Sequence, residues 1–299
     1  MRRKVKITTK LWHPHVTSNL FFERLACIRD SYNFIESEKS KFIIYQSRNC
    51  PVGHRGKVKI QFGVENMKPN MQECDWAFGF PLEEEVSNKR YLRLPNYVRL
   101  GAGDDLVKVN LDVRSIISKK KKFCAFICFN GNVRFRNRFF RRLSQYKRID
   151  APGKVFNNIP FIDGGFNNVE ALERCLVNDF YGKFDRKVKF LRDYKFVIAF
   201  ENEESVGYTS ERLYHAFSAR CIPIYWGNSQ VDKDFNTKSF LNFYDYGSVD
   251  ALIDAVIEID KDEDKWEEML KQPYYHNNKP NKYVDKRRIL QRFGEIFKH

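Results

Sequence analysis

Short apolar runs alternate along this chain with segments in which apolar residues recur at helical spacing. In the first part of the chain the runs predict strands at Val5–Thr8, Phe42–Tyr45, Val58–Phe62 and Trp76–Phe80. Between the first two runs, a helix with one buried face is predicted from Leu20, Phe21, Leu25, Ile28 and Phe34. In the second part the runs predict strands at Phe123–Phe129, Phe196–Phe200, Ile222–Trp226 and Phe240–Tyr244.

Strands that alternate with helices over this length predict an α/β fold with largely parallel sheets. The run Cys221–Trp226 shows no alternation, which is typical of a strand covered on both faces. A break near Ser115–Lys122 divides the chain into two α/β domains, residues 1–118 and 119–278, with a cleft expected between them. Residues 279–299 form a basic segment with a helical apolar stripe, which we expect to pack on the body of the protein.

The composition is that of a globular protein with a strong positive charge. The chain has 299 residues, 42% of them hydrophobic, and no apolar run of the roughly 18 residues needed to span a membrane. The first residues are basic but lack an apolar signal core, so no secretion signal is expected. The formal net charge of +15 favours a polyanionic partner, which could be nucleic acid, an anionic membrane surface or a phosphorylated substrate. Seven cysteines without a Cys-x-x-Cys pair favour a reducing compartment.

The segment from Tyr194 to Gly227 carries the candidate chemistry. Its pattern is strand, acidic loop, helix and strand, and Glu201 and Asn202 follow the first strand, where open α/β sheets bind ligands. Thr209 or Ser210 could cap the helix, whose first turn would contain Glu211 and Arg212. A helix N-terminus beside a guanidinium suits a phosphate group. Alternatively, Glu211 only offsets the helix dipole and Arg212 is solvated.

This segment resembles the donor-binding motif of the α1,3/4-fucosyltransferases, glycosyltransferase family ten, most of all its bacterial members. The matching blocks are Tyr194-Lys195-Phe196, Phe200-Glu201-Asn202, Gly207-Tyr208, Glu211-Arg212 and Ile222-Pro223-Ile224-Tyr225-Trp226-Gly227. The family has lysine where this chain has Arg212. The segment Asp234–Phe240 also resembles the family.

Two further segments extend the resemblance. Arg136 lies in Arg134-Phe135-Arg136-Asn137-Arg138-Phe139-Phe140, which is similar to an Arg-Asn-x-Phe element and implies an arginine on the donor phosphate. Glu65 lies in Gly63–Asn70, which resembles the family's Gly-Glu-Asn-x-x-Pro-Asn loop and implies the catalytic base. The blocks run in order over roughly residues 58–246.

The resemblance implies a GT-B fold, with two Rossmann-like α/β domains, and transfer of L-fucose from GDP-β-L-fucose with inversion. Glu65 would take the proton of the acceptor hydroxyl, and Glu211 would stabilise positive charge on the fucose ring or hold a donor hydroxyl. Arg136 and Arg212 would offset the charge of the leaving diphosphate, and Asn202 and Tyr208 would complete the donor site. No metal site and no tightly bound cofactor are expected, although a divalent cation can stimulate transfer through the diphosphate.

The acceptor implied by the family is O3 of N-acetylglucosamine in a lactosamine-type glycan, with O4 second. Such glycans occur in Lewis antigens, on proteins and in lipopolysaccharide, and the implied setting is the cytoplasm, with possible peripheral contact at the inner membrane through the basic surface. Three alternatives stay open: a GT-B transferase with another nucleotide sugar or acceptor, an inactive relative, and a non-enzymatic nucleic-acid binder. The last would require a basic stripe interleaved with stacking aromatics, whereas the aromatics of this chain fall mainly inside apolar strands.

Overall fold

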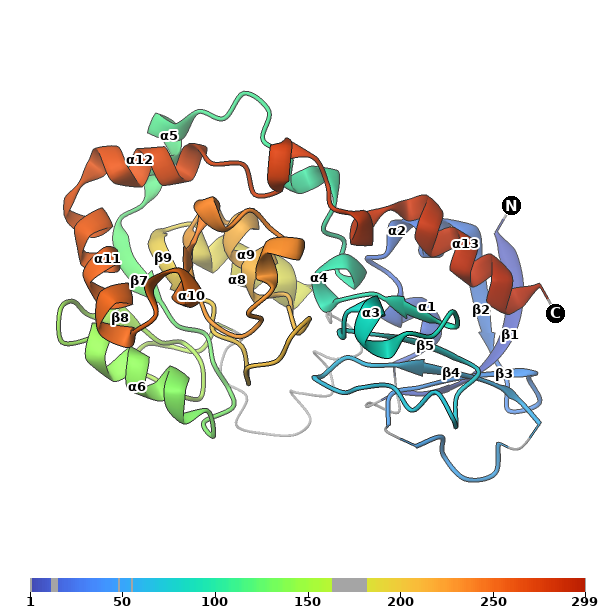
Figure 1. Cartoon of the computed structure of the whole chain (residues 1–299). Coiled ribbons are helices and arrows are strands. Elements are labelled where there is room, and N and C mark those ends of the chain that lie inside the picture. Colours follow the sequence, from blue (N-terminus) through green and yellow to red (C-terminus); the bar gives the residue numbers. More distant parts are fainter. Residues whose placement is uncertain (1, 12–15, 48, 55, 163–181, 299) are drawn as a thin grey trace. The chain divides into compact units, whose positions relative to one another are not determined.

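The computed structural model describes residues 2–11, 16–47, 49–54, 56–162 and 182–298, and it divides the chain into two compact units (Figure 1). Unit 1 comprises Met1–Gly103, Val206–Tyr208 and Lys282–His299, and unit 2 comprises Asp104–Ser205 and Thr209–Asn281. Cys175 lies outside the described residues, and the cysteines within them are free thiols. Among the described helices, none is both long enough and apolar enough to cross a membrane.

Unit 1 is built on a six-stranded sheet in the order β2-β1-β3-β4-β5-β6, in which neighbouring strands are parallel. Its strands are β1 (Arg3–Lys10), β2 (Tyr32–Glu36), β3 (Phe42–Tyr45), β4 (Val58–Phe62), β5 (Trp76–Gly79) and β6 (Tyr91–Arg93). Its helices are α1 (Ser18–Phe21), α2 (Ala26–Ser31), α3 (Glu83–Val86), α4 (Asn96–Arg99) and α13 (Lys286–Phe297).

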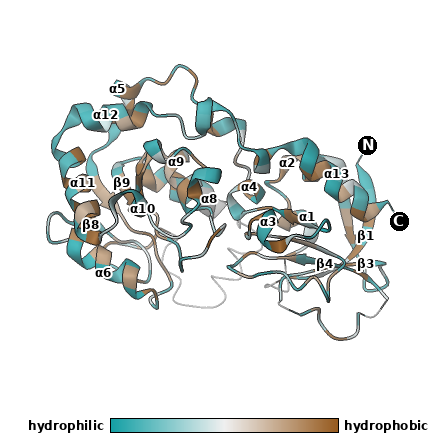
Figure 2. Cartoon of the chain, viewed as in Figure 1, coloured by the Kyte–Doolittle hydropathy of each residue, from teal (hydrophilic) through white to brown (hydrophobic). Residues whose placement is uncertain are grey.

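The last helix, α13, packs on unit 1 through aromatic side chains. The ring of Phe293 lies 5.4 Å from that of Phe22 and 5.2 Å from that of Phe78, and the ring of Phe297 lies 5.0 Å from that of Phe42. Its other positions are mostly charged, and Figure 2 shows hydrophilic and hydrophobic residues side by side on this helix. The burial of one face explains why the end of the chain returns to the first unit.

Unit 2 contains a five-stranded sheet in the order β11-β10-β9-β7-β8, again with parallel neighbours. Its strands are β7 (Lys122–Ala125), β8 (Ile149–Asp150), β9 (Tyr194–Ile198), β10 (Ile222–Tyr225) and β11 (Leu241–Asn242). Its helices are α5 (Val113–Lys119), α6 (Arg134–Leu143), α8 (Gly182–Leu191), α9 (Arg212–Ser218), α10 (Phe243–Tyr246), α11 (Val249–Lys261) and α12 (Glu263–Lys271).

Strand β9 is buried on both faces, as expected for a central strand of a parallel sheet. Phe196 and Ile198 belong to a core shared with residues of α6, α11 and α12, whereas Val197 belongs to a second core shared with residues of α8 and α9. Every residue of β10 is buried as well. The sequence prediction of parallel α/β sheets is therefore confirmed.

Several elements differ from the sequence prediction. The single helix expected around Leu20–Phe34 is two short helices followed by strand β2, because Tyr32–Glu36 pairs in parallel with β1 at the sheet edge. The strand expected at Phe240–Tyr244 is confined to Leu241–Asn242, and Asn242 then donates a hydrogen bond to Asp245 (3.1 Å) inside the turn that begins α10. Short strands β6 and β8 have no equivalent in the prediction.

The division between the units also lies earlier than the expected boundary between residues 118 and 119. Helix α5 belongs to unit 2, since Val113 is part of the core of that unit and Ile116 and Ile117 pack against it. Residues 279–299 were expected to form a basic helix that packs on the body of the protein, and residues 282–299, which include α13, belong to unit 1. A further difference is the excursion of Val206–Tyr208, which leaves unit 2 and joins unit 1.

Candidate active site

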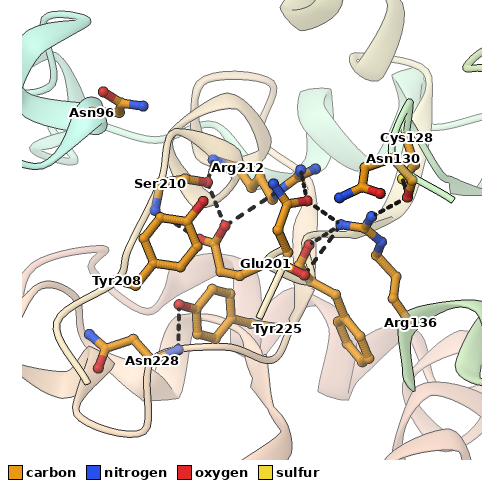
Figure 3. A network of polar contacts seen from close by, with 12 residues as sticks. Asn96, Cys128, Asn130, Arg136, Glu201, Tyr208, Ser210, Arg212, Tyr225 and Asn228 are labelled. Atoms are coloured by element: carbon orange, nitrogen blue, oxygen red, sulfur yellow. Dashed lines mark hydrogen bonds and ion pairs between the residues drawn. The ribbon is translucent and has the colours of Figure 1, made fainter. Parts of the chain in front are cut away.

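The carboxyl end of β9 holds the main polar cluster of unit 2 (Figure 3). Beyond the strand the chain stays paired with the segment after β10, because Ala199 N–H donates to Ile224 O (2.8 Å) and Glu201 N–H donates to Trp226 O (2.8 Å). These bonds deliver Glu201 and Asn202 to the edge of the sheet at which parallel α/β folds bind ligands, as predicted.

Glu201 is a fully buried carboxylate, with 0% of its surface exposed. It accepts hydrogen bonds from the backbone N–H (2.8 Å) and from the hydroxyl (2.6 Å) of Ser210, and Nε of Arg212 lies 3.4 Å from its Oε2. Burial raises the pKa of Glu201 to about 7, against the opposing effects of Arg212 and Ser210. The carboxylate therefore ties the end of β9 to the segment that begins α9.

Arg136, in the first turn of α6, has 0% of its surface exposed. Its guanidinium donates hydrogen bonds to main-chain and side-chain oxygens. Nη1 donates to Phe200 O (3.3 Å), Glu201 O (3.2 Å) and Asn202 Oδ1 (3.0 Å), and Nη2 donates to Asn130 O (2.7 Å). This guanidinium joins the loop after β7 to the loop after β9. The geometry makes Arg136 a support for the two loops, and because it has no exposed surface, a direct phosphate contact would require its surroundings to move.

Arg212, in contrast, keeps 22% of its side chain exposed. Its Nη2 donates to Asn202 Oδ1 (3.3 Å), so Asn202 accepts from both arginines. Arg136, Asn202 and Arg212 are therefore brought together in unit 2, around Glu201. Of the two arginines, Arg212 is the one whose side chain has exposed surface.

Glu211 is the residue immediately before α9, and its side chain makes no capping hydrogen bond. Burial alone would raise the pKa of Glu211, but the charges of His215, Lys187 and Arg212 outweigh it and hold the pKa at about 2. The group is thus ionised over the physiological range.

Of the two predicted capping residues, Thr209 has another partner, since its hydroxyl donates to Asp234 Oδ2 (2.6 Å). The hydroxyl of Ser210 donates to Glu201 and also accepts from the backbone N–H of Arg212 (3.4 Å), the first residue of α9. Since α9 has only seven residues, its N-terminus does not by itself define a phosphate site.

Asp234 is buried and accepts hydrogen bonds from Thr209 and from Asn228 Nδ2 (3.4 Å), whereas Asp232 is exposed. The two residues of this Asp-x-Asp sequence are thus in different environments. Across the ranges that the structure describes, no group of three or more His, Cys, Asp or Glu side chains is placed to hold a metal ion.

Glu65 lies in unit 1, in the loop after β4. It lines a pocket of about 370 Å³ together with Lys10, Leu11, Gln46, Ser47, Val64 and Met67. These residues belong to the ends of β1, β3 and β4 or to the loops that follow them, and those strands are neighbours in the sheet. Tyr208, expected at the donor, belongs to the same unit, and its hydroxyl lies 3.3 Å from Oε2 of Glu65.

The structural roles of Glu201 and Ser210 were missed from the sequence. Glu201 was visible as an acidic residue directly after a buried strand. The sequence did not show whether Ser210, nine residues later, would cap the helix or bind the carboxylate of Glu201.

Comparisons with known proteins identify the family of the chain. The family described as "Glycosyltransferase family 10 (fucosyltransferase) C-term" matches residues 116–287, and the "Alpha-(1,3)-fucosyltransferase FucT N-terminal domain" matches residues 12–100. The chain belongs to glycosyltransferase family 10, as the sequence motifs predicted.

Among individual relatives, an alpha-(1,3)-fucosyltransferase FucT of Helicobacter pylori is 28% identical over 269 residues, which cover 75% of this chain and 52% of the relative. The chain thus spans about half the length of this relative. A crystal structure of an alpha1,3-fucosyltransferase matches with a TM-score of 0.77 at 22% identity, over 100% of this chain and 91% of that one. A second crystal structure, titled as a complex with GDP-fucose, matches with a TM-score of 0.74 at 22% identity, over 100% and 92% of the two chains. The predicted GT-B fold class is confirmed.

Proposed function

We propose that the protein transfers L-fucose from GDP-β-L-fucose to a hydroxyl group of a glycan, with inversion at the anomeric carbon. The observation that carries the proposal is the polar cluster of Glu201, Asn202, Arg136 and Arg212 at the carboxyl end of β9, within the part of the chain that matches the family. The named activity of the relatives and the donor named for the matching crystal structure support the same reaction.

On the acceptor side, Glu65 is the proposed general base. Its side chain is exposed and lines the 370 Å³ pocket of unit 1, which can receive part of a sugar. The acceptor hydroxyl must lose a proton as it attacks the anomeric carbon, and a carboxylate at the pocket wall can accept it. The proposed acceptor is O3 of N-acetylglucosamine in a lactosamine-type glycan, with O4 as the second choice.

On the donor side, Arg212 is the proposed phosphate ligand because 22% of its side chain is exposed and its guanidinium is planar. Arg136 acts on the diphosphate indirectly, by fixing the loop of Phe200–Asn202. Glu211, ionised because its pKa is about 2, supplies negative charge for the developing positive charge on the fucose ring or holds a donor hydroxyl.

We also propose that the protein is cytoplasmic and acts on lipid-linked or surface glycans at the inner face of a membrane. The net charge of +15 and the basic start of α13, Lys286-Arg287-Arg288, support attraction to anionic lipids. Sedimentation with vesicles of anionic lipid, with zwitterionic vesicles as the control, tests this part of the proposal. Equal binding to both vesicle types would contradict it.

The test of the reaction is GDP release by the purified protein supplied with GDP-L-fucose and N-acetyllactosamine. We expect release to depend on the acceptor and to fall at least a hundredfold in Glu65→Gln, because the variant cannot take the proton. Glu73→Gln, which changes an unrelated glutamate of unit 1, is the matched control and should keep full activity.

The second candidate is a GT-B transferase with another nucleotide sugar or acceptor. The donor-side proposal rests on Arg212 and the loop that it contacts. These are proposed to bind the diphosphate, so they do not select the sugar. A panel of GDP- and UDP-sugars, each scored for binding and for acceptor-dependent nucleotide release, distinguishes the two. Binding of GDP without release from GDP-fucose would favour the second candidate.

A further inference from the structure

The tripeptide Val206–Tyr208 lies between the donor-side residues Glu201 and Arg212 in sequence, yet it belongs to unit 1. The flanking residues Ser205 and Thr209 are both bound within unit 2, through Gly227 O (3.1 Å) and Asp234 Oδ2 (2.6 Å) respectively. The chain therefore makes a brief excursion and returns. An excursion of this kind needs specific anchors, and the structure contains them.

The first anchor is the backbone of Gly207. Its φ of +80° is in the region that favours glycine, and a Cβ atom at this position would lie 2.7 Å from Phe80 O. The fully buried guanidinium of Arg93 donates to Gly207 O (2.7 Å) and to Phe80 O (2.8 Å). One arginine thus fastens the excursion to the segment after β5.

The second anchor is the ring of Tyr208, which is 3% exposed and packs edge-on against Phe80 with ring centroids 4.8 Å apart. This packing fixes the direction of the phenol, whose hydroxyl lies 3.3 Å from Oε2 of Glu65. The loop of Glu65 is held in turn, because Asn96 Nδ2 donates to Val64 O (3.1 Å) and Gly63 N–H donates to Phe78 O (2.7 Å). The phenol of Tyr208 and the loop of Glu65 are therefore both held in place by neighbouring residues.

We propose that Tyr208 is a positioning residue for Glu65, and that its hydroxyl holds the carboxylate while the carboxylate faces the pocket of unit 1. This inference rests on the proposed function, in which Glu65 is the general base. It differs from the role implied by the family motif, in which Tyr208 belongs to the donor site. A carboxylate that accepts a hydrogen bond from a fixed phenol loses rotational freedom, which favours one orientation towards the acceptor hydroxyl.

The two roles of Tyr208 give different kinetics in Tyr208→Phe, which removes only the hydroxyl. A positioning role lowers kcat about tenfold at saturating donor and leaves the Kd of GDP within about twofold. A phosphate-binding role weakens the binding of GDP, whether or not kcat also falls. The matched control is Tyr91→Phe, which removes another buried hydroxyl of unit 1, the one that donates to Pro81 O (2.7 Å); it should change neither quantity.

Whether Tyr208 acts through Glu65 is tested with Glu65→Ala and with the double variant that combines Glu65→Ala and Tyr208→Phe. If Tyr208 acts through Glu65, the hydroxyl no longer matters once the carboxylate is absent, so Glu65→Ala and the double variant should transfer fucose at the same residual rate. Multiplicative losses in the double variant, or weaker GDP binding as the main effect of Tyr208→Phe, would overturn the proposal.

A thermal-unfolding cycle on the same four proteins separates this inference from the proposed function. Tyr208→Phe should lower the unfolding midpoint more when Glu65 is present than in Glu65→Ala, whether or not the protein transfers fucose. Additive midpoints would refute the contact itself. If the midpoints are non-additive but the wild type releases no GDP, the contact between Tyr208 and Glu65 is real and the proposed function is refuted. The contact would then have no catalytic role.

Discussion

Arg212 approaches Glu201 through its Nε, which lies 3.4 Å from Oε2 of a carboxylate that has no exposed surface. The same carboxylate is bound twice by Ser210, at 2.8 Å and 2.6 Å. The ion pair does not fully compensate for burial, because the pKa of Glu201 is raised to about 7 from an ordinary value of 4.5. The start of α9 is thus attached to the end of β9 by a group whose charge depends on pH.

The first prediction concerns the stability of the wild type and of Glu201→Gln as a function of pH. Because the pKa of Glu201 is raised in the folded protein, the unfolded chain loses this proton first as pH rises from about 4.5 to 7. Over this window the wild type should lose up to about 3 kcal/mol of unfolding free energy relative to the variant. Urea unfolding at several pH values measures the difference, and parallel pH profiles would contradict the prediction.

The second prediction compares lysine substitutions at the two arginines of the cluster. Arg136→Lys keeps the charge but cannot reach Asn130 O and the Phe200–Asn202 loop at once, so it should lower the unfolding free energy by about 2–4 kcal/mol. Arg212→Lys introduces the residue typical of the family and should change stability by less than about 1 kcal/mol.

Calorimetric titration with GDP completes this comparison. Arg212→Ala should weaken GDP binding about tenfold to a hundredfold, and Arg212→Lys by less than about fivefold. A variant Arg136→Lys that folds as stably as the wild type but binds GDP poorly would show that Arg136 contacts the phosphate directly.

The third prediction uses two glycines of unit 1. Gly207→Ala should lower the unfolding free energy by about 2 kcal/mol or more, because φ is +80° and the new Cβ would lie 2.7 Å from Phe80 O. Gly294→Ala lies in α13, with open space around the added Cβ, and should raise stability by about 0.5–1 kcal/mol. Equal effects of the two substitutions on the urea midpoint would contradict the anchored excursion at Gly207.

The fourth prediction concerns Glu211, whose pKa is lowered to about 2. Because the pKa of Glu211 is lower in the folded protein than its ordinary value of 4.5, the ionised group stabilises the fold at pH values above about 4.5. This stabilisation is lost as pH falls towards 2. Glu211→Gln should therefore be less stable than the wild type at pH 7, by about 1–2 kcal/mol, and the difference should shrink below about pH 4. A difference that stays constant from pH 7 to pH 3 would argue against a charged Glu211.

Much of the strand pattern was predictable because buried parallel strands are continuous apolar runs. The predicted bounds of Phe42–Tyr45 and Val58–Phe62 coincide with β3 and β4. Strand β2 was missed because Phe34 was assigned to the helix of Leu25 and Ile28, although nine residues place Phe34 on the opposite helical face from Leu25. Pairing with β1 makes Tyr32–Glu36 a strand.

The candidate site shows the same limit. Residue types at the end of β9 were visible in the sequence, and so was the motif that contains Arg136. Burial was not visible: an arginine with no exposed surface, Arg136, and one with 22% of its side chain exposed, Arg212, look alike in a basic sequence. The contact between Tyr208 and Glu65 joins positions far apart in the chain, and no local pattern could assign it.

The most direct test of the central claim is the structure of the product formed from GDP-β-L-fucose and N-acetyllactosamine, determined by nuclear magnetic resonance. Attack by a hydroxyl activated by Glu65 predicts one new linkage, an α-fucosyl group on the N-acetylglucosamine residue, and no such product with Glu65→Gln. A β-linked fucose, or the same amount of product with Glu65→Gln, would contradict the account.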